Sequence, residues 1–420
     1  MRKGSTFYLI VAPALLLCAS LLSACQGPTD KVEACNPKSL PVVKTLASVR
    51  PSSQTVYAAS GPNLYAFNAG NGAPRWCSKI TLGNGEDRFT SVASGGRDVY
   101  TYTAEGDTTA FNSGTGAIVW SDDTKTDYEE LNKTPSPLIV HTTIYTGSPS
   151  LYALNSSNGT TNWQYTLPSN VFINEAPVES EGKLFIGTNS FQQTSSSRLP
   201  DQIYELDAAT GNKRWAFSLK QNDMLWGDLV ASNGMIVFPY QERVSNTYIT
   251  FLQALNAQNG KAIWQKELWL PDHPVAANGL LYVAGFVPDD KNEDQVLYAL
   301  DIRTGTVRWS LTNKVDSDDP FLVTNTTLYT ANGDGKITAF DALTGELLWQ
   351  GQLRLSTKTA LTGRLALLDN RLFVGTESAN FSTHPDFYIH AFNLTTHQED
   401  WQANITGVET SNVVTISVGV

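Results

Sequence analysis

The residue types that carry out catalysis are sparse in this sequence and lack catalytic spacing. Its five histidines are His141, His273, His384, His390 and His397. There is no HExxH metal motif, GxSxG nucleophile motif, Walker loop or CxxC pair. The stretch Asn332-Gly333-Asp334-Gly335-Lys336 offers oxygen ligands but lacks the glutamate that closes a calcium loop. We therefore expect a tight hairpin turn there, no metal site, and a protein that is not an enzyme.

The chemistry expected at Cys25 concerns export. Arg2 and Lys3 precede an apolar run from Phe7 to Leu22, and small residues lead to Cys25. This pattern is typical of a secretion signal, and the apolar core is short for a membrane span. It resembles bacterial lipoprotein signals, which implies cleavage before Cys25 and an acyl anchor on its thiol. The alternatives are an ordinary signal peptide with a chance cysteine, or a short anchor helix.

Two further cysteines remain once Cys18 leaves with the signal and Cys25 takes the lipid. These are Cys35 and Cys77. An exported pair of thiols usually oxidises, so we predict a disulfide between them, with two unpaired cysteines as the alternative.

Composition indicates many short strands and an acidic surface. Hydrophobic residues make up 41% and charged residues 16% of 420, with 31 glycines and 19 prolines, which favours an all-β fold. The formal net charge is −11, and losing Arg2 and Lys3 makes it more negative. Phosphate backbones would be repelled, so we expect no nucleic-acid partner.

One motif recurs eight times, from YAFNAGNGAPRW to HAFNLTTHQEDW. Each copy has an Asn or Asp that can cap a turn, and seven copies place a glycine four residues later, where a hairpin with a bulge needs positive φ. A β-rich run precedes each hairpin, so each unit supplies four strands. The sequence predicts an eight-bladed β-propeller of four-stranded antiparallel blades. The motif tryptophans are Trp76, Trp120, Trp163, Trp215, Trp264, Trp309, Trp349 and Trp401.

The pattern Ala-x-Asp/Asn-x-x-x-Gly-x-x-x-Trp resembles the tryptophan-docking motif of PQQ-like propellers. Those repeats occur in quinoprotein dehydrogenases and in the BamB family of outer-membrane assembly lipoproteins, and here they cover about residues 55 to 401. The resemblance implies that each tryptophan packs beside the motif alanine and glycine of a neighbouring blade. Glu205 replaces the alanine in the fourth copy and His397 the glycine in the eighth. We expect those two interfaces to be the loosest.

The resemblance extends to the repeat and not to a cofactor. Quinoprotein dehydrogenases carry a disulfide between adjacent cysteines and a calcium site, whereas this chain has no adjacent cysteine pair. We therefore expect no bound PQQ. A WD40 propeller is disfavoured because no motif tryptophan is followed by Asp.

Loop lengths point to a recognition face. The turn between the second and third strands lengthens at 189–202, 241–247, 288–295 and 377–386, the first three in consecutive blades. In propellers these turns share one face with the connectors between blades, and the connectors here are acidic. Decorated loops on a rigid scaffold suit recognition, although tolerated drift is the alternative. The acidic residues are Glu86, Asp87, Asp122, Asp123, Asp127, Glu129, Glu130, Asp316, Asp318 and Asp319.

The ring needs one more strand than the first blade supplies. The β-branched run 412–418 is predicted to insert into that blade as its innermost strand, the alternative being a disordered tail. We expect residues 1–24 to be the cleaved signal peptide, residues 25–50 a lipidated linker, and residues 51–420 one propeller domain.

Together these features favour a non-catalytic, monomeric cell-envelope lipoprotein that binds other envelope proteins. It would sit on the periplasmic side of the outer membrane, or on the outer side of the cell membrane if the host has only one. Outer-membrane protein assembly is the sharpest version of this hypothesis. The alternatives are a carbohydrate-binding or cell-wall-binding propeller, with Trp226 and Trp269 as candidate contacts, and a hydrolase or PQQ-dependent dehydrogenase-like enzyme.

Overall fold

A computed structural model shows the architecture of much of the chain. The part it describes contains strands as its regular elements, and within that part no helix is long and apolar enough to cross a membrane. The described residues are 31–34, 41–45, 52–81, 89–103, 106–123, 136–147, 149–173, 175–190, 199–245, 247–286, 294–315, 320–355, 359–378, 387–405 and 415–419.

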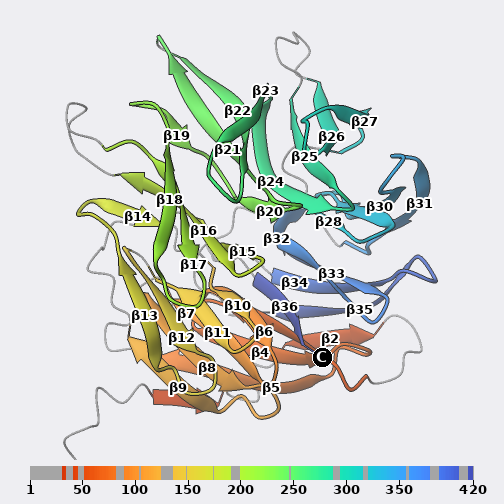
Figure 1. The fold of residues 1–420 in the computed structure, drawn as a ribbon. Helices are drawn as coiled ribbons and strands as arrows, with labels where there is room; N and C mark the ends of the chain where they lie inside the picture. The colour runs from red at the N-terminus through yellow and green to blue at the C-terminus, as the bar shows by residue number, and fades with distance from the viewer. Residues whose placement is uncertain are drawn as a thin grey trace, which may run out of the picture.

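Eight antiparallel sheets form a ring, which confirms the predicted eight-bladed propeller (Figure 1). In each blade one strand lies toward the middle of the ring and the last motif strand lies toward the rim. From the inner to the outer edge, blade 1 contains β36 (Thr415–Gly419), β3 (Thr55–Ser60), β4 (Asn63–Asn68), β5 (Pro74–Thr81) and β1 (Lys31–Ala34); blade 2 contains β6 (Phe89–Gly95), β7 (Asp98–Thr103), β8 (Asp107–Asn112) and β9 (Ile118–Asp123); blade 3 contains β10 (Leu138–Val140), β11 (Thr143–Thr146), β12 (Ser150–Asn155) and β13 (Thr161–Thr166).

Blades 4 and 5 each have an inner edge made of two short strands that pair with one partner. Blade 4 contains β14 (Val171–Ile173) and β15 (Val178–Ser180), then β16 (Lys183–Ser190), β17 (Gln202–Asp207) and β18 (Lys213–Ser218); blade 5 contains β19 (Met224–Leu225) and β20 (Val230–Ser232), then β21 (Met235–Val244), β22 (Thr247–Asn256) and β23 (Ala262–Glu267).

The last three blades return the chain to its start. Blade 6 contains β24 (Trp269–Ala277), β25 (Leu280–Phe286), β26 (Gln295–Asp301) and β27 (Val307–Thr312); blade 7 contains β28 (Phe321–Val323), β29 (Thr327–Ala331), β30 (Lys336–Asp341) and β31 (Leu347–Gln352); blade 8 contains β32 (Thr359–Leu368), β33 (Arg371–Ser378), β34 (Phe387–Asn393), β35 (Gln398–Ile405) and β2 (Val42–Thr45).

The C-terminal strand closes the ring as predicted. Strand β36 pairs antiparallel with β3 at the inner edge of blade 1, from Thr55↔Gly419 to Ala59↔Thr415. The first part of the predicted run, residues 412–414, lies outside the described residues. The N-terminal strand β1 and the C-terminal strand β36 therefore belong to one sheet, as expected.

The segment expected to be a linker differs from the prediction. Strands β1 and β2 lie within residues 25–50, yet β1 pairs with β5 at the rim of blade 1 and β2 pairs with β35 at the rim of blade 8. The outer strand of a blade has an unpaired edge, and an extended stretch containing Val42 and Val43 can complete it.

The hydrophobic core lies between blades and not within one sheet. One cluster, for example, joins Tyr57 and Leu64 of blade 1 to Val99 and Phe111 of blade 2. Second and third strands are buried along most of their length because neighbouring blades cover both faces. Outer strands alternate, as in β18, since one of their faces meets solvent.

The motif hairpins have the turn chemistry that the sequence predicts. In blade 1 the Asn68 side-chain oxygen accepts hydrogen bonds from the amides of Gly70 and Asn71, at 3.0 and 3.2 Å. Gly72 has φ +74°, and the β4–β5 register shifts between Ala66 and Phe67, so the hairpin carries a bulge. These hairpins lie on what we call the motif face. The opposite side is the loop face, which carries the turns between second and third strands and the connectors between blades.

Candidate functional site

Seven of the eight motif tryptophans dock onto the next blade through the same pair of contacts. Each indole Nε1 donates a hydrogen bond to a backbone carbonyl, and each indole lies against the motif glycine of that blade, where a Cβ atom would approach within 2.5–2.9 Å. These tryptophans therefore stabilise the ring by fixing each blade to the next. The donor and acceptor pairs are Trp76 to Ser113, Trp120 to Ser156, Trp163 to Ala208, Trp215 to Ala257, Trp264 to Ile302, Trp309 to Ala342 and Trp401 to Ala69, at 2.8–3.2 Å.

The motif alanine has a different place from the one that the resemblance implies. Ala66 lies directly across from Trp76 on the neighbouring strand of the same blade, and the other copies repeat this register. A small side chain there leaves room for the indole of its own blade, whereas the glycine comes from the next blade. The expectation that both residues belong to the neighbour is thus half correct.

Trp349 docks differently because His397 stands where the other copies have glycine. The imidazole stacks on the indole with ring centroids 4.2 Å apart and an interplanar angle of 20°. His397 has φ +53°, the left-handed conformation that glycine adopts in the other copies. This interface was expected to be among the loosest, but a ring-on-ring contact occupies it.

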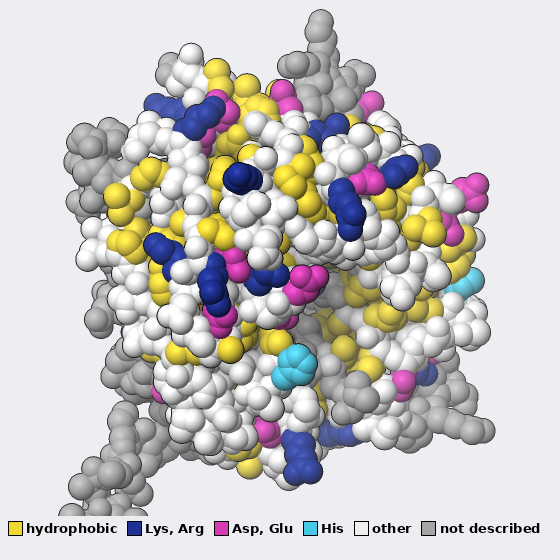
Figure 2. Space-filling view, in the orientation of Figure 1, with side chains coloured by type: hydrophobic (Ala, Val, Ile, Leu, Met, Phe, Trp, Pro, Cys, Tyr) yellow, Lys and Arg dark blue, Asp and Glu magenta, His cyan; other side chains and the backbone are white. Residues whose placement is uncertain are grey.

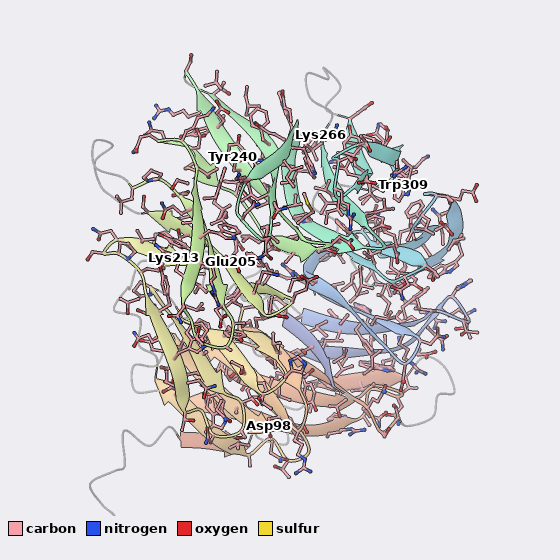
Figure 3. The ribbon with its side chains drawn as sticks, viewed as in Figure 1. Asp98, Glu205, Lys213, Tyr240, Lys266 and Trp309 are labelled. Carbon is pink, nitrogen blue, oxygen red and sulfur yellow. The ribbon has the colours of Figure 1, made fainter. Side chains whose placement is uncertain are left out.

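Glu205 occupies the alanine position of the fourth copy and is only 5% exposed. It lies across from Trp215 and on the strand next to Lys213 (Figure 3). Burial raises the pKa of the Glu205 carboxyl, while the charges of Lys183 and Arg214 act in the opposite direction. Trp215 nevertheless keeps its hydrogen bond to Ala257.

Of the three cysteines to which the sequence assigns a role, only Cys77 lies in the described residues. Cys25 and Cys35 lie outside the described residues. Cys77 is buried and disulfide-bonded. The ladder of β1 and β5 ends at Ala34↔Ser78, and the next residues along the two strands are Cys35 and Cys77. This register supports the predicted pair, which stays a prediction.

The loop face differs from its prediction in two described places. Residues 241–247, expected to be a loop, mostly continue the β21–β22 hairpin, whose ladder runs to Val244↔Thr247. Asp122 and Asp123, expected to be connector residues, end β9 and pair with Thr108 and Asp107. Backbone pairing continues past the point at which the side-chain pattern becomes polar. The other predicted loops and acidic connectors lie largely outside the described residues.

The stretch from Asn332 to Lys336 is a tight turn, as predicted. The Gly335 amide donates to the Asn332 carbonyl at 2.8 Å, and the Lys336 amide donates to the Asn332 side chain at 2.9 Å. Across the part of the chain that the structure describes, no group of three His, Cys, Asp or Glu residues could hold a metal ion.

Exposed large hydrophobic side chains gather on the loop face of blades 4, 5 and 6. The β21–β22 hairpin has strands of ten residues, against six to eight in the corresponding strands of blades 4 and 6, and it projects from the ring (Figure 1). The same three blades have the lengthened loops noted in the sequence. We call this set the apolar loop patch: Leu199, Trp226, Val244, Tyr248 and Trp269, each 41–47% exposed.

A charged network in the central channel was missed by sequence reasoning. It is centred on Asp228, between β19 and β20, whose Oδ2 accepts hydrogen bonds from His273 Nδ1 at 2.6 Å and from an Arg364 Nη2. A side-chain hydrogen bond joins Glu175 to the same carboxyl group. The four residues come from the inner edges of blades 5, 6, 8 and 4.

Electrostatics holds Asp228 in its charged form. Burial alone would raise the pKa of Asp228, but the hydrogen bond from His273, the charges of Arg364 and His273, and the hydrogen bond from Glu175 keep that pKa well below its ordinary value. Figure 2 shows a hollow near the middle of the viewed face, with basic, acidic and histidine side chains beside it.

A second histidine is enclosed within blade 8. His390 Nδ1 lies 2.6 Å from Glu399 Oε1, and its Nε2 lies 2.9 Å from Thr376 Oγ1. This hydroxyl, imidazole and carboxyl series has the order of a catalytic triad. All three residues are at most 2% exposed, so no substrate reaches the hydroxyl. These hydrogen bonds instead satisfy polar side chains that are buried within the blade.

A hollow of about 610 Å³ lies on the motif face beside Asn278, Asp301 and Arg308. The carboxylate of Asp301 and the guanidinium of Arg308 satisfy each other there at 2.7 Å. The hollow therefore presents a closed ion pair and few unpartnered polar groups.

Comparisons with known proteins agree with this architecture. A family model described as "Outer membrane protein assembly factor BamB" matches residues 38–198 and 249–418. The chain is 23% identical over 301 residues to the Yersinia pestis protein of that name, covering 65% of this chain and 69% of that protein. It is 26% identical over 239 residues to a tetrathionate hydrolase of Acidithiobacillus ferrooxidans, covering 52% of this chain and 45% of the hydrolase.

Solved structures show the same fold. BamB from Moraxella catarrhalis is 17% identical with a TM-score of 0.50, covering 86% of this chain and 97% of that one. A quinohemoprotein alcohol dehydrogenase from Comamonas testosteroni is 15% identical with a TM-score of 0.57, covering 87% and 75%. Because scaffolds and enzymes both have this fold, function has to be argued from the site.

Proposed function

This chain belongs to the family described as outer membrane protein assembly factor BamB, and from that membership we propose that it is a non-catalytic cell-envelope scaffold. It binds another envelope protein through the apolar loop patch on blades 4, 5 and 6. The propeller supplies a rigid platform, because tryptophan docking fixes each blade to the next.

The observation that carries this proposal is the position of the apolar loop patch. Its five side chains lie on three consecutive blades of one face, and two of them are tryptophans. Aromatic residues are enriched at protein interfaces, and contiguous exposed apolar surface marks interaction sites. The other exposed large hydrophobic side chains of the described residues lie on outer strands or motif hairpins, for example Leu347 and Leu348 on β31.

The finer part of the proposal is a role in assembling outer-membrane proteins from a membrane-anchored position. The family description supports the assembly role, and the predicted acylation of Cys25 supports the anchor. Mass spectrometry of the N-terminal peptide from the native host tests the anchor. We expect a chain that starts at acylated Cys25, and an unmodified Cys25 would contradict it.

A photo-reactive amino acid placed at Tyr248 tests the interaction face in the native host. We expect a discrete adduct with one envelope protein. The matched control is Leu347, an exposed hydrophobic position on the rim of blade 7, from which that adduct should be absent. The double substitution Val244→Ser with Tyr248→Ser should abolish binding of the identified partner by the purified chain. Because both side chains are exposed, stability should change by only about 0.5 kcal/mol.

The carbohydrate-binding hypothesis is the second candidate, because Trp226 and Trp269 are each 41% exposed. Sugar binding would depend on these two indoles and not on Val244 or Tyr248. Retention on purified cell wall that survives Tyr248→Ser and is lost in Trp226→Ala would favour this candidate. An equal adduct yield from Tyr248 and Leu347 would refute the scaffold proposal.

A further inference from the structure

Strand β1 enters blade 1 from the loop face. It pairs antiparallel with β5, starting with Lys31↔Thr81. Strand β5 begins at Pro74, directly after the motif hairpin of blade 1, and it ends at Thr81, where the connector to blade 2 starts. Lys31 therefore lies at the loop-face end of the rim of blade 1.

The pairing of β1 with β5 fixes this entry point to the propeller. The ladder contains four residue pairs and ends at Ala34↔Ser78. Beside it, Cys77 is buried and disulfide-bonded, and its predicted partner, Cys35, directly follows β1 in the sequence. A covalent link at this point keeps β1 on the rim when the chain before it is pulled.

The predicted anchor is separated from β1 by five residues only. Cys25 is the predicted acylation site, and residues 26–30 join it to Lys31. Six peptide units span at most about 22 Å even when they are fully extended. An acylated Cys25 at the surface of a bilayer therefore holds Lys31 within that distance of the lipid, whatever the conformation of the residues between them.

The motif-face end of the same rim lies farther along the strand. The eight residues of β5, at about 3.3 Å per residue, carry the rim about 23 Å from its loop-face end to its motif-face end. That length matches the full reach of the tether. The loop-face end is therefore the part of blade 1 that the anchor keeps close to the bilayer.

We propose that the loop-face end of blade 1 lies against the lipid bilayer and that the loop face of the ring is turned toward the membrane. A short tether that leaves one face of a rigid ring holds that face toward the surface to which it is tied. This inference rests on the acylation of Cys25 in the proposed function.

The orientation also defines the kind of partner that fits the apolar loop patch. The patch is on the same face, on blades 4, 5 and 6, which lie across the ring from blade 1. A protein bound there meets the propeller from its membrane side. The partner is therefore an envelope protein whose bound part lies close to the bilayer.

Energy transfer from a fluorescent amino acid to acceptor-labelled lipid headgroups tests the contact of blade 1. The sample is the full lipidated chain, purified from the native host and placed in vesicles of phosphatidylethanolamine and phosphatidylglycerol. The matched positions are Lys79, near the loop-face end of β5, and Ala73, in the motif hairpin, and both are exposed. We expect transfer from position 79 to be at least twofold more efficient than transfer from position 73.

A second matched pair tests the orientation of the ring. Tyr248 lies on the loop face of blade 5 and Gln258 lies in its motif hairpin, and both are exposed. We expect more efficient transfer from position 248 than from position 258. Equal transfer from the two positions, or more efficient transfer from position 258, would overturn the proposed orientation of the loop face.

Two insertions between Gly27 and Pro28 test whether the tether sets this geometry. A flexible insertion of twelve Gly and Ser residues extends the reach, so the contrast between positions 79 and 73 should largely disappear. The matched control is a two-residue Gly-Ser insertion at the same point, which should preserve most of the contrast. A full contrast in the chain with the long insertion would contradict the tether as its cause.

Mass spectrometry of the same vesicle sample separates this inference from the proposed function. An unmodified Cys25 would overturn both the anchor and the orientation. An acylated Cys25 with equal transfer from positions 79 and 73 would overturn the orientation alone, and the anchored scaffold would stand.

Discussion

The indole Nε1 of Trp401 donates a 3.1 Å hydrogen bond to the carbonyl oxygen of Ala69, 332 residues earlier in the chain. The indole is fully buried and also lies against Gly72, where a Cβ atom would approach within 2.7 Å. The last blade is therefore docked on the first by the contact that joins most other blades, and Val43 of β2 packs beside it.

Replacing Trp401 with alanine should be the most costly single change among the motif tryptophans. It leaves a cavity in a fully buried position and removes the docking of the closing interface, with an expected loss of about 4 kcal/mol in the free energy of unfolding. Trp309→Ala, at a partly exposed indole, should cost less. Urea unfolding followed by circular dichroism measures both, and equal losses would contradict a special role for closure.

Removing residues 415–420 should open the ring. Strand β3 would lose its inner partner along five residue pairs, and the Ser94 amide would lose its 2.9 Å hydrogen bond to the Ser417 hydroxyl. We expect a loss of several kcal/mol and fast hydrogen exchange at β3 amides. Ser417→Ala removes only the hydroxyl and should cost about 1 kcal/mol. An unchanged melting temperature in the truncated chain would disprove closure by β36.

Replacing His397 with alanine and replacing it with glycine should change the free energy of unfolding by different amounts. His397→Ala loses the stack on Trp349 and keeps the unfavourable positive φ, so it should cost about 1–2 kcal/mol. His397→Gly loses the stack but relieves the backbone, so the change should stay within about 1 kcal/mol. Chemical denaturation of both variants checks this. A glycine variant less stable than the alanine variant would show that φ is not the deciding cost.

Glu205→Gln should stabilise the protein at neutral pH. Burial raises the pKa of Glu205 in the folded state, so the folded chain holds this proton more tightly than the unfolded chain does. The carboxyl group is therefore compatible with folding below its ordinary pKa and becomes unfavourable as the pH rises through the raised value. Urea midpoints of the variant and the unsubstituted chain should differ at pH 7 and converge at pH 4. The opposite trend would mean that Lys183 and Arg214 dominate.

Cys35→Ser and Cys77→Ser should each destabilise the chain to the same extent. In the chain-entropy model a disulfide closing a loop of about 40 residues contributes roughly 3–4 kcal/mol. Alkylation followed by mass spectrometry should find neither thiol free in the native protein. Unequal effects of the two substitutions, or a labelled Cys35, would exclude the pair.

Most of the fold could be predicted because the residues that make the contacts between blades recur at the same positions in the repeats. The pairing of a tryptophan with a glycine, as in Trp76 and Gly116, recurs at seven of the eight interfaces, where the glycine has a positive φ and leaves room for the indole. Such requirements are local or repeated, so they are visible as a pattern in one dimension. The closing strand was predictable for a related reason, since the first blade had too few β-rich runs.

The channel network could not be predicted in this way. Asp228, His273 and Arg364 differ in type, share no motif and are separated by up to 136 residues. Nothing local requires them to meet, and no repeat relates one to another. The stack of His397 on Trp349 and the addition of β1 and β2 to the rims likewise depend on which blades become neighbours. The sequence by itself determined the blades and the docking between adjacent ones. Only closure of the ring brought inner edges from different blades within hydrogen-bonding distance, because that proximity exists only after every interface has formed.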